Sequence, residues 1–204
     1  MQSMAEPTRD SQVFRVGRGA RREPVVPSSV LGMAVFVVTE IMFFAGLISA
    51  YLIAKGAATS GWPPPGQPRL PVEETALNSC ALIASGVLLF LAGRAFGKEQ
   101  QTRTHWLYVA SMVLGTAFVG LQGAEWVALI REGLTLTTST HGSFFYLLVG
   151  LHALHAVAAL MALVWAYARL RRGTLERSQL WTAQIFWYFV VLVWPVLYYQ
   201  VYLS

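Results

Sequence analysis

Four ionisable side chains, Glu40, Glu125, His152 and His155, stand inside long apolar stretches of this chain. Glu40 lies in the middle of an apolar run that is long enough to cross a bilayer. An ionised carboxylate at that depth is costly, so Glu40 must face protein or water, stay protonated, or have a partner. Two interpretations follow: a structural carboxyl bonded to a neighbouring helix, or a group in a proton path.

His152 and His155 are three residues apart and therefore share one face of a helix. Neutral imidazole could ligate a metal or a haem, but His105 and His141 lie at helix ends, far from these two side chains. The favoured interpretation is an interhelical hydrogen bond or a carboxylate partner, and contact with a lipid headgroup or a quinone is the other alternative. Glu40 and His155 have similar predicted depths, so they meet if their helices are neighbours.

Gln122 and Glu125, in the segment GLQGAEW, also share a helix face. Glu125 is predicted to lie about 7 Å below the outer end of its helix, where a polar face is inexpensive. Interhelical hydrogen bonding or binding of a lipid amine is the alternative. Cys80 is the single cysteine, so the chain can form neither an internal disulfide nor a two-cysteine metal site, and we expect it to be a small packing residue.

The motifs of soluble catalysis are missing from the sequence. It contains no GxSxG, no glycine-rich phosphate loop and no HExxH. An independent enzyme would have to work with the few ionisable groups inside the apolar stretches. We therefore expect no catalytic residues and no activity of the chain alone.

Composition predicts which secondary structure carries these ionisable side chains. Of the 204 residues, 55% are hydrophobic and 12% are charged, about half the charged fraction of a soluble domain. About 20 apolar residues span a bilayer, and the sequence contains five such continuous stretches. A closed barrel would show short segments of alternating polarity instead. The prediction is an all-α, polytopic transmembrane helical bundle, with spans at 30–54, 75–97, 105–130, 141–169 and 181–203.

The basic residues indicate an orientation. A net charge of +5 could suggest nucleic acid, but the Lys and Arg residues flank the spans, and twelve of the fifteen fall on one side. The positive-inside rule then places the N-terminus in the cytoplasm and the C-terminus outside, with anionic lipid contact as a second role of these loops. Residues 1–29 are expected to form a basic, Pro/Arg-rich, flexible cytoplasmic segment, and residues 30–204 the membrane domain. We expect no nucleic-acid partner.

The longest predicted loop, residues 55–75, lies on the outer side and contains five prolines. Prolines oppose a helix and favour an extended segment, which includes Trp62, Pro63 and Pro64. In the last span, Pro195 is expected to remove one helical hydrogen bond.

Several motifs occur in a fixed order along about 175 residues. They are TEIMFFAGLISAY with Glu40, a proline-rich loop followed by Leu77, Asn78 and Ser79, GLQGAEW with Gln122, Glu125 and Trp126, and HGSFFYLLVGLHALHAVAA with Gly142, Ser143, Phe144, Phe145, Gly150, His152 and His155. Together they resemble subunit III of the haem-copper cytochrome c oxidases, in its short five-helix form. The last helix departs from the family's WHFVD-like pattern, because Tyr188 and Val191 replace its histidine and aspartate.

The resemblance implies a non-catalytic accessory subunit in aerobic electron transport. Subunit III binds no redox metal, packs on subunit I, holds phospholipid, supports proton uptake and protects the enzyme during turnover. We therefore expect no cofactor in this chain, haems and copper in partner subunits, and bound phospholipid. The expected partners are subunits I and II, with a small subunit IV as a further candidate and cytochrome c as electron donor to the complex. The expected location is the bacterial inner membrane.

Other functions remain open at this point. Within the family these are subunit III of a quinol oxidase and the accessory protein of nitric oxide reductase. A self-standing haem-binding membrane anchor would use His152 or His155. A small proton-coupled transporter would be built around Glu40 and Glu125, although the chain lacks the inverted repeat that many transporters contain.

Overall fold

The computed structural model describes residues 27–59, 61–64, 68, 70–137 and 139–203. These residues form five long helices and a final π-helical turn, with no strand among them. All five helices are long and apolar enough to cross a membrane, so the predicted all-α bundle with five spans is confirmed. The elements are α1 (Ser28–Gly56), α2 (Val72–Phe96), α3 (Gln101–Arg131), α4 (Thr140–Arg171), α5 (Arg177–Tyr198) and the π turn Tyr199–Leu203.

Each helix begins one to four residues before the apolar run that predicted it. Hydropathy detects only the part that suits lipid, whereas the helix itself continues into the polar interface until a cap ends it. Most of the predicted N-terminal segment, residues 1–26, lies outside the described residues, while Ser28 and Ser29 already belong to α1.

Glycines with positive φ end α3 and α4. Gly133 (φ +94°) and Gly173 (φ +68°) follow these helices, and each donates its N–H back into the last turn. Leu134 N–H reaches Leu129 O at 3.0 Å, which completes the Schellman geometry at the end of α3. At the start of α4, Ser139 Oγ accepts from Gly142 N–H at 2.9 Å. These caps fix where the short connections begin.

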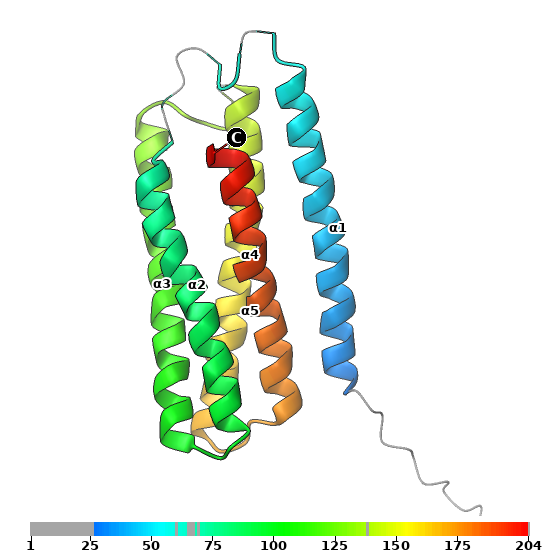
Figure 1. Cartoon of the computed structure of the whole chain (residues 1–204), viewed down its shortest axis with the longest axis vertical. Coiled ribbons are helices and arrows are strands. Elements are labelled where there is room, and N and C mark those ends of the chain that lie inside the picture. The colour runs from blue at the N-terminus through cyan, green and yellow to red at the C-terminus, as the bar shows by residue number, and fades with distance from the viewer. Residues whose placement is uncertain (1–26, 60, 65–67, 69, 138, 204) are drawn as a thin grey trace, which may run out of the picture.

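Helices α2 to α5 form one bundle, and α1 lies along the side of it (Figure 1). Helix α2 packs mainly on α3, whereas α5 contacts α1, α2 and α4. One end of the bundle holds the start of α1 and the α2–α3 and α4–α5 connections, and the other holds the end of α1 and the C-terminus (Figure 1). Helix α5 is therefore the element that joins α1, α2 and α4, while α3 packs on α2 and α4.

Among the described residues, four side-chain hydrogen bonds join helix α5 to α2, and one of them runs from Tyr198 Oη to the Val72 carbonyl at 2.9 Å. Trp187 Nε1 donates to Ser85 Oγ at 3.1 Å, and Trp194 Nε1 donates to Ser79 Oγ at 2.7 Å. Gln184 Nε2 donates to the Leu89 carbonyl at 3.1 Å. Lipid is as apolar as the helix surfaces, so such bonds and close packing hold membrane helices together.

Gly115 of α3 makes room for the Trp187 ring. A Cβ at Gly115 would lie 2.6 Å from Trp187 Cζ2, and the ring is buried and held by Ser85. We expect Gly115→Ala to lower the free energy of unfolding by about 1–3 kcal/mol, measured by detergent titration of the purified chain. The control is Gly120→Ala on the same helix, where a Cβ meets nothing within 4 Å. Equal stability of both variants would contradict this packing.

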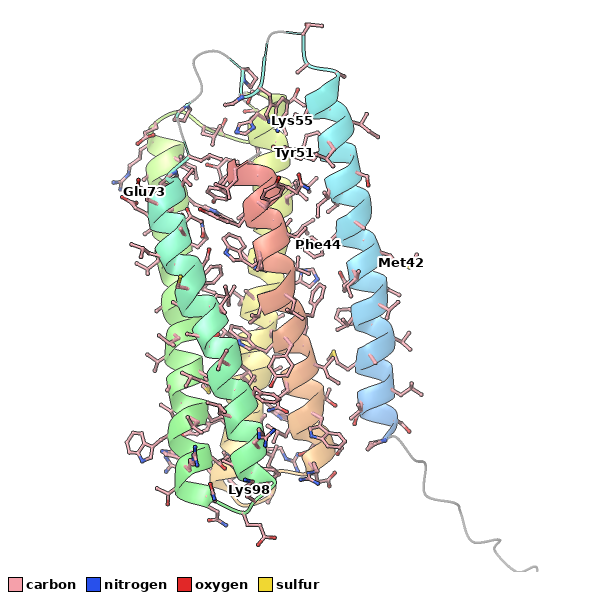
Figure 2. All side chains as sticks on the ribbon, in the orientation of Figure 1. Met42, Phe44, Tyr51, Lys55, Glu73 and Lys98 are labelled. Carbon is pink, nitrogen blue, oxygen red and sulfur yellow. The ribbon has the colours of Figure 1, made fainter. Side chains whose placement is uncertain are left out.

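Helix α1 presents one face to the bundle and the other outward. Phe44 and Tyr51 point toward the bundle and are buried, whereas Met42 points away and is exposed (Figure 2). On α2, Cys80 is exposed, so its prediction as a packing residue is wrong. Its neighbour Ser79 is buried, and one residue of helix rotation turns Cys80 away from α5.

Candidate functional site

Glu40 of α1 and His155 of α4 form an ion-pair contact between the two helices. Glu40 Oε2 lies 3.1 Å from His155 Nε2, and the two side chains are 19% and 13% exposed. The other ring nitrogen, Nδ1, lies 2.7 Å from the carbonyl of Leu151, one turn earlier on α4. Glu40 and His155 are therefore in contact, as predicted for the case that their helices are neighbours.

The hydrogen bonds of His155 limit where its protons can be. A carbonyl only accepts, so Nδ1 must carry a proton and donate it to Leu151 O. Nε2 then either accepts from a protonated Glu40 or, as part of an imidazolium, donates to its carboxylate. Both arrangements have zero net charge. The pair can hold one proton on either partner without placing an uncompensated charge in the membrane.

Aromatic rings surround this pair. The imidazole of His155 lies 5.4 Å from the ring centroid of Phe44, 5.8 Å from that of Phe189 and 6.4 Å from that of Phe186. Such apolar surroundings lower the local dielectric constant and strengthen the hydrogen bond between Glu40 and His155. Phe44 and Phe189 also contact each other, so the same rings attach α1 to α5.

His152 has a different environment from His155. It is 1% exposed, and neither ring nitrogen has a hydrogen-bond partner among the described residues. Its ring lies 5.0 Å from Trp194 in a tilted arrangement, beside a cavity of about 150 Å³ between α3, α4 and α5. The predicted interhelical hydrogen bond is thus found for His155 and is wrong for His152, which packs among aromatic rings.

Gln122 and Glu125 belong to a polar network near the other end of the bundle. Gln122 Nε2 donates to Glu125 Oε2 at 2.8 Å and to Tyr202 Oη at 3.2 Å. Thr75 Oγ1 donates to Glu125 Oε2 at 2.9 Å, and Asn78 Nδ2 donates to the Phe118 carbonyl at 3.2 Å. The network joins α2, α3 and the π turn. Gln122 and Glu125 thus form interhelical hydrogen bonds, which was one of the two alternatives for these residues.

The loop between α1 and α2 is attached to α1 and α4 through Trp62. Its Nε1 donates to Tyr51 Oη at 3.1 Å, and its ring packs edge-on against His141 at 5.2 Å. Pro63 is exposed and Pro64 half-buried. Of the three predicted loop residues, Trp62 therefore carries the contacts.

Sequence reasoning missed the side chains that α5 and the π turn contribute. The sequence pattern did not single out Trp187, Trp194 and Tyr202, yet all three are buried. Trp187 and Trp194 are seven residues apart and so share a helix face, which was the available signal. Val191, at the position of the family's aspartate, lies against Gly86 of α2 in an apolar contact.

None of these polar groups forms a metal centre. Among the residues that the structure describes, no group of three or more His, Cys, Asp or Glu side chains could hold a metal ion. The polar side chains instead join helices to one another. Fold and site together define a multi-pass membrane protein whose described polar groups connect its spans.

Comparison with known proteins identifies the family. The family model for cytochrome c oxidase subunit III matches residues 1–204. The chain therefore belongs to the cytochrome c oxidase subunit III family, whose members are haem-copper oxidase subunits that carry no haem.

Three curated relatives illustrate the similarity. A probable cytochrome c oxidase subunit 3 of Mycobacterium leprae is 34% identical over 180 residues, which cover 84% of this chain and 86% of the relative. The probable subunit 3 of Nocardia farcinica is 31% identical over the same shares. The subunit 3 of Petromyzon marinus is 30% identical over 192 residues, 90% of this chain and 72% of the relative.

Proposed function

We propose that this chain is the non-catalytic accessory subunit of a cytochrome c oxidase in a bacterial inner membrane, where it packs on subunit I and supports proton uptake and stability during turnover. Haems and copper reside in the partner subunits, which take electrons from cytochrome c. The bacterial relatives named above support this location. Phospholipid is a further ligand of the chain.

The observation that carries this proposal is the Glu40–His155 pair. The pair can share one proton at zero net charge, and both of its side chains are partly exposed. A proton can move between Oε2 and Nε2 over a single hydrogen bond of 3.1 Å. A partner helix against α1 would exchange protons with this unit, so the pair sustains proton delivery to subunit I.

The distribution of charge supports the proposed orientation. Lys98 lies near the end where α1 begins, whereas Lys55 lies at the opposite end (Figure 2). Arg94 lies in the last turn of α2, and Arg103 and Arg177 lie in the first turns of α3 and α5, at the same end as Lys98. The positive-inside rule makes the first end cytoplasmic. The N-terminus then faces the cytoplasm and the C-terminus faces the outside.

Glu40→Gln tests the proton role. The glutamine amide can still donate to His155 Nε2 but cannot exchange a proton, so the complex should assemble normally and lose activity severalfold faster during sustained turnover. The measurement is the number of oxygen molecules reduced before inactivation, with the rate of proton uptake as a second readout. Glu125→Gln is the control, because it removes the same chemical group from the separate network near the other end.

The outcomes separate two roles of Glu40. If Glu40→Gln changed neither the number of oxygen molecules reduced before inactivation nor the rate of proton uptake, the proton role would be rejected and Glu40 would have only a packing role. Equal losses in Glu40→Gln and Glu125→Gln would also reject it, since Glu125 has no contact with His155.

A further inference from the structure

A groove of about 540 Å³ lies between α2 and α3, the pair of helices at the side of the bundle opposite α1 (Figure 1). We propose that this groove seats a transmembrane helix of a partner chain, and that this helix carries a lysine or an arginine near the end of the bundle where α2 begins. The inference goes beyond the proposed function, which places a partner against α1 and none against this opposite face.

The groove presents carboxylates that have no cationic partner in the described chain. Glu74 of α2 and Glu125 of α3 both line it, and neither forms an ion pair with a described residue. Thr75 and Gln122 donate to Oε2 of Glu125, whereas its Oε1 accepts from no described residue. Lysine and arginine side chains only donate, so a basic side chain complements these acceptors in both charge and hydrogen bonding.

Asn78 adds a third acceptor to the same groove. The residue is 3% exposed, and its Nδ2 donates to the Phe118 carbonyl inside the contact of α2 with α3. Its Oδ1 is buried and has no donor among the described residues. A buried acceptor without a donor is costly, above all in a membrane. A donor supplied by a partner helix would therefore stabilise the assembled state.

Small side chains line the rest of the groove. They are Ala81 of α2 and Ala124 and Ala128 of α3, and the exposed side chains of Leu77 and Leu121 lie in the same lining. Small residues let two helix backbones approach closely, which is a main source of helix association in membranes. The lining therefore suits a helix with a small-residue face of its own.

The small residues continue along α3 beyond the groove. Thr116, Gly120, Ala124 and Ala128 recur at every fourth position, and all four are exposed. A Cβ at Gly120 would meet nothing within 4 Å, so no described neighbour uses the space at this glycine. From Thr116 to Ala128 the helix extends about 18 Å, more than half of the hydrocarbon thickness. This length favours a partner helix over a lipid amine, which would occupy only the end with the acceptors.

The test is photocross-linking in native membranes, followed by purification in mild detergent through a tag on this chain. A photoreactive phenylalanine analogue replaces Leu77, which is 76% exposed and lines the groove, and mass spectrometry identifies the captured molecule. We expect a polypeptide whose transmembrane segment carries a lysine or an arginine near the end that faces the start of α2.

Two variants with matched controls tie the capture to the groove. Ala124→Leu fills the groove, so the yield of the cross-link should fall about tenfold, whereas Val127→Leu on the same helix but outside the groove should not change it. Glu74→Gln removes one of the carboxylates and should lower the yield about threefold. Its control is Glu73→Gln, because Glu73 is the other acidic residue in the first turn of α2 and does not line the groove. Helical circular dichroism of each variant separates a lost contact from a lost fold.

Several results would overturn the proposal. Capture of an aminophospholipid alone would make the groove a headgroup site, and capture of the haem-containing subunit would make it part of the catalytic interface. Capture of a second copy of this chain, or of a segment without a basic residue, would also contradict it. So would equal yields from Ala124→Leu and Val127→Leu. A failure of the oxidase role would appear separately, as purification without a haem-containing subunit whatever position 77 captures.

Discussion

Glu40→Lys is expected to prevent assembly of the chain into its complex, while Glu40→Gln assembles at normal levels. Glu40 lies about 18 Å along α1 from Ser28, near the middle of the span. A lysine at the centre of a span costs about 2.5–3.5 kcal/mol on insertion scales. Its ammonium could donate to His155 Nε2, but the positive charge would remain uncompensated, whereas the native pair is neutral.

The measurement is the amount of complex recovered through a tag on this chain, relative to the chain present in membranes. A Glu40→Ala variant serves as a second control, because it removes the carboxyl without adding a charge. Normal recovery of the lysine variant would contradict the placement of Glu40 against protein.

Trp187→Ala should produce the largest loss of stability among single substitutions of the bundle. Trp187 is fully buried, its ring packs on Gly115 of α3, and its Nε1 donates to Ser85 of α2. Truncation leaves a cavity at the contact of three helices. We expect the free energy of unfolding to fall by about 3 kcal/mol, the lower end for tryptophan truncation in soluble cores. The loss is at the lower end because the side chain of a separated helix still lies in lipid and not in water.

Trp106→Ala is the matched control for Trp187→Ala. Trp106 is 65% exposed on α3, so its removal should change the free energy of unfolding little. Both variants would be unfolded by detergent titration with helical circular dichroism as the readout. A similar loss in the two variants would show that Trp187 does not organise the bundle.

The spans were predictable from sequence because length and continuous apolarity are fixed by the thickness of a bilayer. The depth of Glu40 and His155 was also predictable, since a helix rises by a constant amount per residue. These depths do not depend on which helices are neighbours. Only the structure shows that Glu40 and His155 are in contact.

The faces of the helices were not predictable in the same way. In a soluble helix the apolar stripe marks the buried side, but a membrane helix is apolar toward lipid as well as toward its neighbours. Cys80 and Ser79 therefore could not be told apart as exposed and buried. For the same reason, the sequence pattern did not single out Trp187 and Trp194, although both donate hydrogen bonds to α2.

His152 illustrates a further limit of sequence patterns. It shares a helix face with His155, and spacing alone predicts similar surroundings. The partner helices decide otherwise, because α1 brings a carboxylate to His155 while α5 brings the Trp194 ring to His152. Which side chain faces a histidine depends on neighbours that are distant in sequence.

We propose that this chain acts as an oxidase accessory subunit without a redox centre of its own. The most direct measurement is gentle purification through a tag on this chain, followed by mass spectrometry of the co-purifying proteins and a reduced-minus-oxidised spectrum. We predict recovery with a large haem-containing subunit and oxygen-reductase activity, and no Soret band once the chain is separated. A chain that purifies alone and retains haem absorbance would contradict the claim and make His152 or His155 a haem ligand.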